Sequence, residues 1–383
     1  MPFGTWPLWL NLLLFLVGAG IICTLGVRLE RVVDVIAGRT GLGHALAGLV
    51  LLAAATSLPE IATSASATLA GNPDLAVHNL FGTIPANLLI LVLADALVGR
   101  RALTGFSPRF DLLTEGLGVV VMLALGVMVL VMGEVPGPRV LGWTVNVPLL
   151  LLPVAYVVLV RLVNIGREHP RWQPDAPRSH TGSANGEGAP EDGRHDRGDG
   201  RGRALRNASM TRLWGGFAAL ALLVFAAGWL LARLGDSIAQ QTGLGGGVVG
   251  MLMLAVATSL PEISTTLSAA LHGNVTMAIS NIFGSCLFDV ALLFLPGLLS
   301  VGPVVHDARS AVFVAALGIT MTTVYLWGLL EHRQRTVFRL GVDSVMVLML
   351  YVVGAVGVVT LQHQDQMNDG TRSVSVIRMQ QSD

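Results

Sequence analysis

Residues 34–87 read DVIAGRTGLGHALAGLVLLAAATSLPEIATSASATLAGNPDLAVHNLFGTIPAN, and residues 236–289 read DSIAQQTGLGGGVVGMLMLAVATSLPEISTTLSAALHGNVTMAISNIFGSCLFD. The two stretches align without a gap and are identical at half of their positions. They share TGLG, ATSLPEI, GN and N-x-F-G segments in the same register. An apolar composition would make two stretches similar, but it would not match these polar segments. The sequence therefore predicts an internal duplication.

The composition around the duplication is typical of a membrane protein. Of the 383 residues, 53% are hydrophobic and 13% are charged, which is too apolar for a soluble protein of this size. The apolar blocks are about 20 residues long, enough to cross a bilayer as a helix. The first block lacks a basic n-region and a cleavage site, so we expect a retained helix rather than a signal peptide. The sequence predicts an all-α integral membrane protein whose ten transmembrane helices lie at roughly 8–27, 43–70, 75–98, 113–133, 143–163, 213–234, 245–271, 277–300, 309–331 and 338–361.

The charged residues indicate the orientation. Acidic and basic residues number 24 each, so no polyanionic partner such as nucleic acid is indicated. The basic residues cluster in alternate loops, and placing these loops in the cytoplasm puts both termini outside the cytoplasmic membrane. Cys23 and Cys286 lie in apolar blocks, so we expect neither a disulfide nor a metal cluster.

The chain divides into four parts. The N-terminal five-helix half, 1–163, carries the first copy of the repeat, and the C-terminal half, 213–362, carries the second. Between them, 164–212 is polar and rich in Gly, Arg and Asp, which predicts a disordered cytoplasmic linker. A calcium-sensor role would need EF-hand spacing, and the acids of 191–199 lack it. The polar segment 363–383 is expected to be a flexible tail.

Because each half holds five spans, an odd number, the second copy enters the membrane from the opposite side. The sequence therefore predicts two inverted five-helix repeats with broken helices at the midplane, as in many secondary transporters. The alternative is an old duplication kept only for packing. The repeated residues are polar and lie at membrane depth, which favours a functional role.

The ATSLPEI segments carry oxygen atoms to membrane depth. Pro59 lies within its predicted span, and proline kinks a helix and leaves the carbonyl four residues earlier without its N–H partner. Thr56 and Ser57 precede Glu60 by four and three residues, so their hydroxyls share a helix face with the carboxylate. A carboxylate, hydroxyls and free carbonyls are hard ligands that suit Ca²⁺ or Na⁺. A proline can be a simple packing kink, but a buried glutamate in each of two equivalent segments favours function.

The spans that follow add a second set of polar side chains. Thr83 and Asn87 are four residues apart, as are Ser285 and Asp289, so each pair lies on one helix face. The pseudo-two-fold axis of an inverted repeat should bring these helices together with those of the ATSLPEI segments. The expected site then holds three carboxylates, on Glu60, Glu262 and Asp289, that need bound cations or a proton. Glycines in the TGLG segments and at 82 and 284 are expected to allow close helix approach.

At these residues the chain resembles the cation/calcium exchanger superfamily, and in particular a prokaryotic sodium/calcium exchanger. The resemblance covers both motif copies and the five-plus-five layout. By this resemblance the ion ligands are Thr56, Ser57, Glu60, Thr83, Asn87, Thr258, Ser259, Glu262, Ser285 and Asp289, with backbone carbonyls near Ala53 and Ala255.

The chain departs from the superfamily pattern at several positions. His78 and Ser280 stand where glycine is common, and His78 has two interpretations, a group that tunes pH response and a histidine near the membrane interface. Ile84 and Cys286 replace a usual asparagine. Pro85 is expected to interrupt its helix.

The function expected from these features is Ca²⁺ export against Na⁺ by alternating access, with Ca²⁺ and Na⁺ ions and the lipid bilayer as partners. The same fold coupled to H⁺, or moving another divalent cation, remains an alternative. A passive channel is disfavoured, because a channel does not need two inverted halves around one buried site. An intramembrane enzyme is disfavoured because no H-E-x-x-H or G-x-S-x-G segment occurs, and no cofactor is expected.

Overall fold

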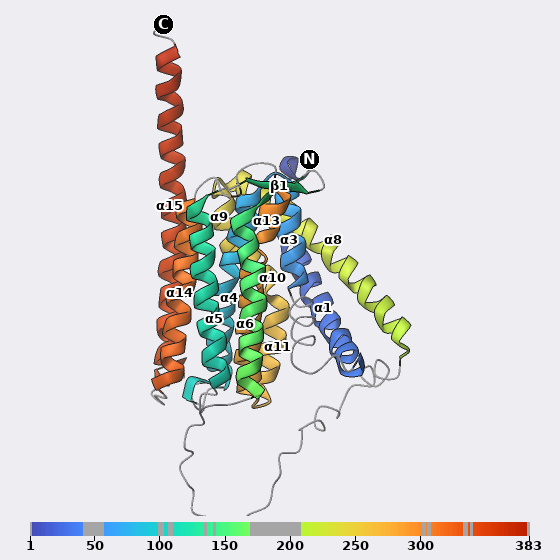
Figure 1. Ribbon diagram of the computed structural model, residues 1–383. Helices are drawn as coiled ribbons and strands as arrows, with labels where there is room; N and C mark the ends of the chain where they lie inside the picture. Colours follow the sequence, from blue (N-terminus) through green and yellow to red (C-terminus); the bar gives the residue numbers. More distant parts are fainter. Residues whose placement is uncertain are drawn as a thin grey trace, which may run out of the picture.

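The computed structural model describes residues 2–40, 57–98, 103–105, 110–133, 136–140, 143–168, 208–300, 304, 308–331, 336–337 and 340–380. Within these ranges the chain is almost entirely helical (Figure 1). The α-helices are α1 (Leu8–Thr40), α3 (Leu58–Leu69), α4 (Pro73–Val98), α5 (Phe110–Met132), α6 (Leu151–Glu168), α8 (Met210–Thr242), α9 (Gly245–Val249), α10 (Ala255–Thr258), α11 (Leu260–Leu271), α12 (Val275–Ala291), α13 (Phe294–Leu299), α14 (Ala308–Glu331) and α15 (Val342–Gln380). A π-helical turn, η4 (Gly250–Leu254), joins α9 to α10, and the 3₁₀ turns are η1 (Pro2–Thr5), η2 (Leu103–Gly105) and η3 (Val147–Leu150). Two short antiparallel hairpins pair β1 (Pro136–Val140) with β2 (Trp143–Asn146), and β3 (Thr336–Val337) with β4 (Leu340–Gly341).

Seven described segments are long and apolar enough to cross a membrane, and they confirm seven predicted spans. They are Leu8–Val33, Pro73–Val98, Leu112–Met132, Met210–Thr242, Val275–Leu299, Ala308–Glu331 and Val342–Gln364. An eighth predicted span corresponds to a bent pair, Gly245–Thr258 followed by Leu260–Leu271, with an angle of 50° between its parts. The first part of the predicted span 43–70 lies outside the described residues, which resume at Ser57.

Two predicted boundaries differ from the structure. The span predicted at 143–163 begins as strand β2, because Trp143, Thr144 and Val145 favour extended backbone, and its apolar helical part is Val147–Val163. The last helix was expected to end near 361, but α15 continues to Gln380. The flexibility predicted for 363–383 stays a prediction. So does the disorder predicted for the linker, because most of the linker lies outside the described residues.

The two motif copies form the same local structure. Ser57 (φ −87°, ψ 15°) precedes α3, and Ser259 (φ −79°, ψ 5°) precedes α11. Each helix then has its proline in the first turn, where no intrahelical N–H partner is required. In the second copy the proline coincides with the break between α10 and α11, which confirms the expected kink there. Pro85 does not interrupt α4, so that expectation is wrong; packing of this fully buried part of the helix compensates for the one missing N–H.

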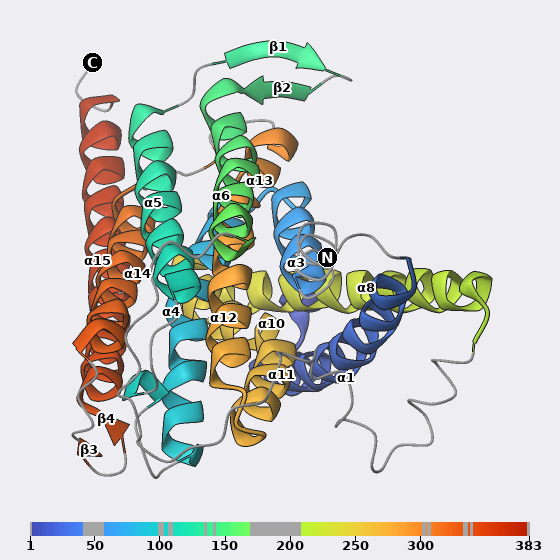
Figure 2. The same ribbon diagram turned by 60° about the horizontal axis from the view of Figure 1, so that its bottom comes forward.

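Each half of the chain packs its first helix against the motif helix of the other half. A Cβ on Gly26 of α1 would lie 2.5 Å from the Pro261 side chain at the start of α11. A Cβ on Gly228 of α8 would lie 2.6 Å from the side chain of Ala62 in α3, close to the Pro59 carbonyl. Gly26 and Gly228 occupy the same repeat position, as do Pro59 and Pro261. The two halves are therefore joined by two reciprocal contacts, and α1 and α8 lie side by side (Figures 1 and 2).

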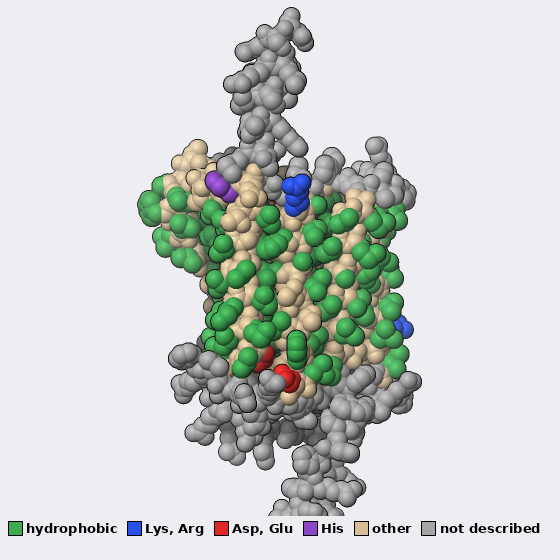
Figure 3. Space-filling model, turned by 90° about the vertical axis from the view of Figure 1, so that its left-hand side faces the viewer, with side chains coloured by type: hydrophobic (Ala, Val, Ile, Leu, Met, Phe, Trp, Pro, Cys, Tyr) green, Lys and Arg blue, Asp and Glu red, His purple; other side chains and the backbone are tan. Residues whose placement is uncertain are grey.

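The buried core and the surface both suit a bilayer. The main core gathers side chains from α4, α5, α12 and α14, while large side chains on the outside stay exposed, such as Leu222 at 71% and Val353 at 67%. Hydrophobic side chains dominate the face over α14 and α15, and its acidic and histidine side chains lie toward its ends (Figure 3). The first residues of the chain and the end of α15 lie at one end of the bundle. α6 ends and α8 begins at the opposite end (Figure 1).

Candidate ion-binding site

The predicted site residues are buried wherever the structure describes them. Ala53 and Thr56 lie outside the described residues. The other ten have at most 4% of their surface exposed, and they are Ser57, Glu60, Thr83, Asn87, Ala255, Thr258, Ser259, Glu262, Ser285 and Asp289. Four of these ten come from the first half of the chain and six from the second. Burial of this many polar groups in a membrane protein indicates a functional interior.

The three predicted carboxylates lie in one region of the core. Glu60, at the start of α3, interacts electrostatically with Glu262 at the start of α11 and with Asp289 in α12. These are like charges, so burying them together is unfavourable unless cations or protons compensate. The structure thus brings together acids from both halves, as the repeat predicts.

Hydroxyl groups from the opposite motif copy accompany two of these acids. The Thr258 hydroxyl lies close to Glu60, and the Ser57 hydroxyl lies close to Asp289. Neither contact reaches hydrogen-bond geometry, and the carboxylate oxygens of Glu60 and Asp289 have no hydrogen-bond partner in the described part of the chain. Ser285 donates a hydrogen bond of 3.3 Å to Glu262 Oε1. A buried acceptor without a donor is costly. These carboxylate oxygens are therefore in the arrangement expected for groups that bind a ligand from outside the protein.

The arrangement is not a closed coordination shell. Among the described residues, no group of three or more His, Cys, Asp or Glu side chains stands in positions that could hold a metal ion. Ca²⁺ takes six to eight oxygen ligands, so hydroxyl, amide and carbonyl oxygens would have to complete the set. The Ala255 carbonyl, expected as one of these, accepts hydrogen bonds from the Ser259 N–H (3.1 Å) and the Thr258 hydroxyl (3.2 Å). Its role as an ion ligand therefore requires these bonds to open.

A second layer of hydrogen bonds holds each pair of motif helices, and it was not predicted. The Asn79 amide donates to the Thr63 hydroxyl (3.1 Å), which joins α4 to α3. At the equivalent place, the Asn281 amide donates to Thr265 (3.2 Å) and so joins α12 to α11. The signal was available, because both asparagines belong to the repeated N-x-F-G segments.

The positions that depart from the superfamily pattern also have defined surroundings. Cys286 is buried and accepts from the Asn87 amide at 3.8 Å, which links the two copies next to Asp289. His78 is 1% exposed and its Nε2 forms a hydrogen bond of 2.9 Å with Ser310 Oγ, so its ring is buried between helices, and both interpretations of this residue stay hypotheses. A Cβ on Gly82 would lie 2.6 Å from Met251 Cα, which confirms close approach there. Gly284 has no neighbour within 4 Å of such a Cβ, so the same expectation for Gly284 is wrong.

Comparison with known proteins gives the family. A model of the family described as sodium/calcium exchanger protein matches residues 10–162 and 212–360. The chain belongs to this family. The matched residues include both motif copies and leave out the linker and the end of the chain. The chain is a multi-pass protein of the cell membrane, and its family is one of transporters.

Individual relatives support the same assignment. The chain is 27% identical over 284 residues to the putative antiporter CaxA of Alkalimonas amylolytica, across 72% of this chain and 76% of CaxA. Its fold is similar to that of the sodium-calcium exchanger NCX_Mj soaked with Na⁺ and Sr²⁺, with a TM-score of 0.53 at 18% identity over 91% of this chain and 98% of the other. It is also similar to the H⁺/Ca²⁺ exchanger CAX, with a TM-score of 0.58 at 12% identity over 96% and 90% of the two chains. At these identities, the two structures establish the fold alone.

Proposed function

We propose that the chain is a secondary active antiporter that exchanges Ca²⁺ for Na⁺ across the cytoplasmic membrane by alternating access. The observation that carries this proposal is the meeting of Glu60, Glu262 and Asp289 in one buried region built by both halves. Clustered buried carboxylates favour bound cations, and a divalent cation neutralises two of them at once. The family assignment and the putative antiporter CaxA point to the same class of activity.

We further propose ten spans arranged as two inverted halves, with the predicted ligands forming one site between them. The reciprocal packing of Gly26 on Pro261 and of Gly228 on Ala62 supports a pseudo-two-fold relation between the halves. The positions of the chain ends support it too, since both lie opposite the ends of α6 and α8 that flank the linker. Alternating access requires that one half can move against the other around a buried site, and two packed halves provide that geometry.

The experiment that tests this function is ⁴⁵Ca²⁺ uptake into proteoliposomes of the purified protein under an imposed Na⁺ or pH gradient. We expect an outward Na⁺ gradient to drive uptake. Uptake driven by a pH gradient alone would identify H⁺ rather than Na⁺ as the counter-ion. H⁺ is the second candidate because the fold is similar to that of the H⁺/Ca²⁺ exchanger CAX. Uptake that no gradient accelerates would contradict antiport and favour a channel.

Asp289 is the position at which the two copies differ in charge, because its counterpart is Asn87. We predict that Asp289→Asn, which makes the copies alike, preserves folding and retains some Ca²⁺ binding but changes the counter-ion or pH dependence of exchange. The physical reason is that Glu60 and Glu262 still supply two charges for Ca²⁺, while the third charge is available to the counter-ion. Fluxes in Na⁺ and pH gradients measure this. Unaltered dependence on both gradients, or complete loss of Ca²⁺ binding, would show that this division of roles is wrong.

A further inference from the structure

A small cavity lies beside α12, outside the group of predicted ligands. Its volume is about 20 Å³, which is room for roughly one water molecule. Side chains of α5, α6 and α12 line it, and three of them are polar: Glu115, Tyr156 and Ser280. The remaining lining is apolar apart from Gly284, whose missing side chain leaves this space open.

Glu115 is a buried carboxylate that the proposed ion site does not use. Only 3% of its surface is exposed, and its Oε1 accepts a hydrogen bond of 3.0 Å from the Ser280 hydroxyl. This bond joins α5 of the first half to α12 of the second half. An acid at such a place is costly to bury as an ion, so its retention in the helix calls for an explanation.

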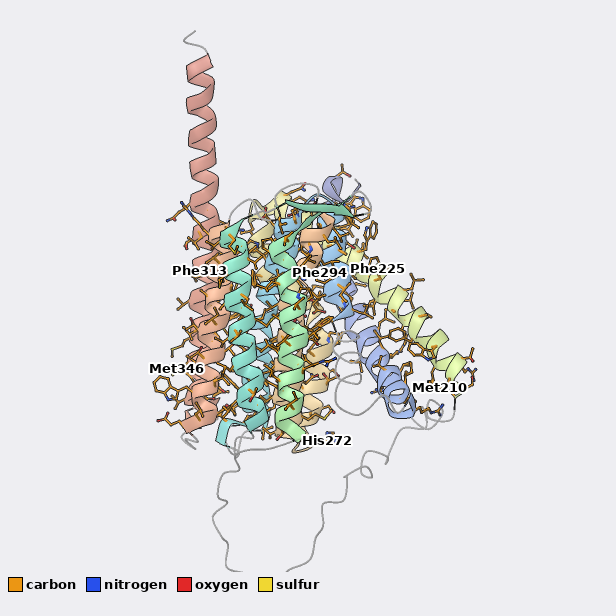
Figure 4. The ribbon with its side chains drawn as sticks, in the orientation of Figure 1. Met210, Phe225, His272, Phe294, Phe313 and Met346 are labelled. Carbon is orange, nitrogen blue, oxygen red and sulfur yellow. The ribbon has the colours of Figure 1, made fainter. Side chains whose placement is uncertain are left out.

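Glu115 and Ser280 lie at the side of the cavity toward the end of the bundle that carries the linker, whereas Gly284 and Leu287 extend its lining to the level of Ser285. Glu115 and Ser280 each follow the start of their helix by five residues, or about 7.5 Å of helix rise. α5 and α12 both start at the end where α6 finishes, the end that also holds Met210 and His272 (Figure 4). Along α12, Ser280 is about 7.5 Å before Ser285 and about 13 Å before Asp289.

The chemistry of the cavity selects among possible occupants. Ca²⁺ takes six to eight oxygen ligands, and one carboxylate, one serine hydroxyl and one tyrosine hydroxyl provide too few. The apolar remainder of the lining also gives no partner for a hydrated cation. A proton on Glu115 fits these surroundings, because the carboxyl then needs no further oxygen ligands and its Oε1 already accepts a hydrogen bond from Ser280.

We propose that Glu115 and Ser280 form a proton-binding site on the linker side of the ion site, separate from the ligands that hold Ca²⁺. Proton binding there switches Glu115 between a charged and a neutral form, and the charge acts on cations moving between the linker side and Asp289. The inference rests on the proposed antiport, because it assumes that cations pass along α12. It assigns pH sensitivity to a residue outside the ion site.

The helices packed against α5 carry other titratable groups. α6 carries Tyr156 and the exposed Arg161, α12 carries Cys286 and Asp289, and α14 carries Tyr325 and Glu331. Of these six, Tyr156 lines the cavity. It also interacts electrostatically with Asp289, which links the lining of the cavity to one of the predicted ligands.

The test uses Glu115→Gln, which keeps the size and the acceptor for Ser280 but cannot take up a proton. Infrared difference spectra of the purified protein between acidic and alkaline pH should show a protonated-carboxyl band that is lost in this variant. In proteoliposomes, the variant should retain Ca²⁺ exchange but lose the acid-side pH dependence of the wild type, staying at the rate of the protonated wild type throughout. Glu331→Gln, on the exposed end of α14, is the matched control and should keep both the band and the pH profile.

Ser280→Ala gives a second variant that leaves the carboxyl in place. It should keep the band and move the midpoint of its titration, because it removes the hydroxyl that bonds Glu115. A band that persists unchanged in Glu115→Gln, or a midpoint that Ser280→Ala leaves unaltered, would overturn the proposal and reduce the pair to a structural contact. Failure of the antiport proposal would be seen separately, as wild-type Ca²⁺ flux that no gradient drives. The infrared result does not depend on it.

Discussion

Replacing Glu60 or Glu262 by glutamine should abolish Ca²⁺ exchange while the protein still folds and inserts. Both side chains are fully or almost fully buried, and they come from equivalent places in the two copies. Glutamine has the same size and removes only the charge, so the loss would report the electrostatic requirement of a desolvated divalent cation. The measurement is ⁴⁵Ca²⁺ flux in proteoliposomes containing equal amounts of each variant.

The matched control for both variants is again Glu331→Gln, which removes a carboxylate at the exposed end of α14. It should exchange Ca²⁺ at the wild-type rate. If Glu60→Gln or Glu262→Gln also exchanged at the wild-type rate, that glutamate would have a structural role, and the proposed site would lose one of its two main charges.

Adding one methyl group at Gly26 should strongly reduce exchange, because the two halves contact each other there without space for a side chain. The new Cβ would lie 2.5 Å from Pro261 Cγ, immediately before Glu262, so Gly26→Ala must displace α1 or the start of α11. Overpacking of this kind costs about 1–3 kcal/mol, which corresponds to a loss of roughly 5- to 150-fold in rate if it falls on the transporting conformation. Gly228→Ala, at the equivalent contact with Ala62, should behave in the same way.

Gly20→Ala is the control for this prediction, since Gly20 lies on the same helix and has no neighbour within 4 Å of an added Cβ. It should leave both stability and flux unchanged. Equal fluxes in Gly20→Ala and Gly26→Ala, with both proteins folded, would show that the close contact between α1 and α11 is not required for exchange.

The sequence was informative where the signal is local or repeated. Apolar blocks located seven complete spans, and the duplicated ATSLPEI segments located the paired starts of α3 and α11. Burial of the polar residues followed from the same duplication. The two copies carry the same chemistry at the same spacing, so each supports the interpretation of the other.

Other features depend on contacts between segments far apart in the chain. Glu115 has no equivalent acid in the second half, so the duplication gave no reason to select it. Its bond to Ser280 and the cavity beside it are visible only in the folded structure. Gly26 and Gly228 lie before the aligned stretches, and their partners are visible only in three dimensions. The continuous α4 shows the same limit, because the cost of Pro85 is offset by packing rather than by any local feature of sequence.

Equilibrium binding of ⁴⁵Ca²⁺ to the purified protein tests the central claim most directly, namely that both halves build one cation site. The structure predicts a single saturable Ca²⁺ site that either Glu60→Gln or Glu262→Gln removes completely, although these residues lie in different halves. Persistence of half of the bound Ca²⁺ in each single variant, and its loss only when both are combined, would contradict a shared site and indicate two independent ones.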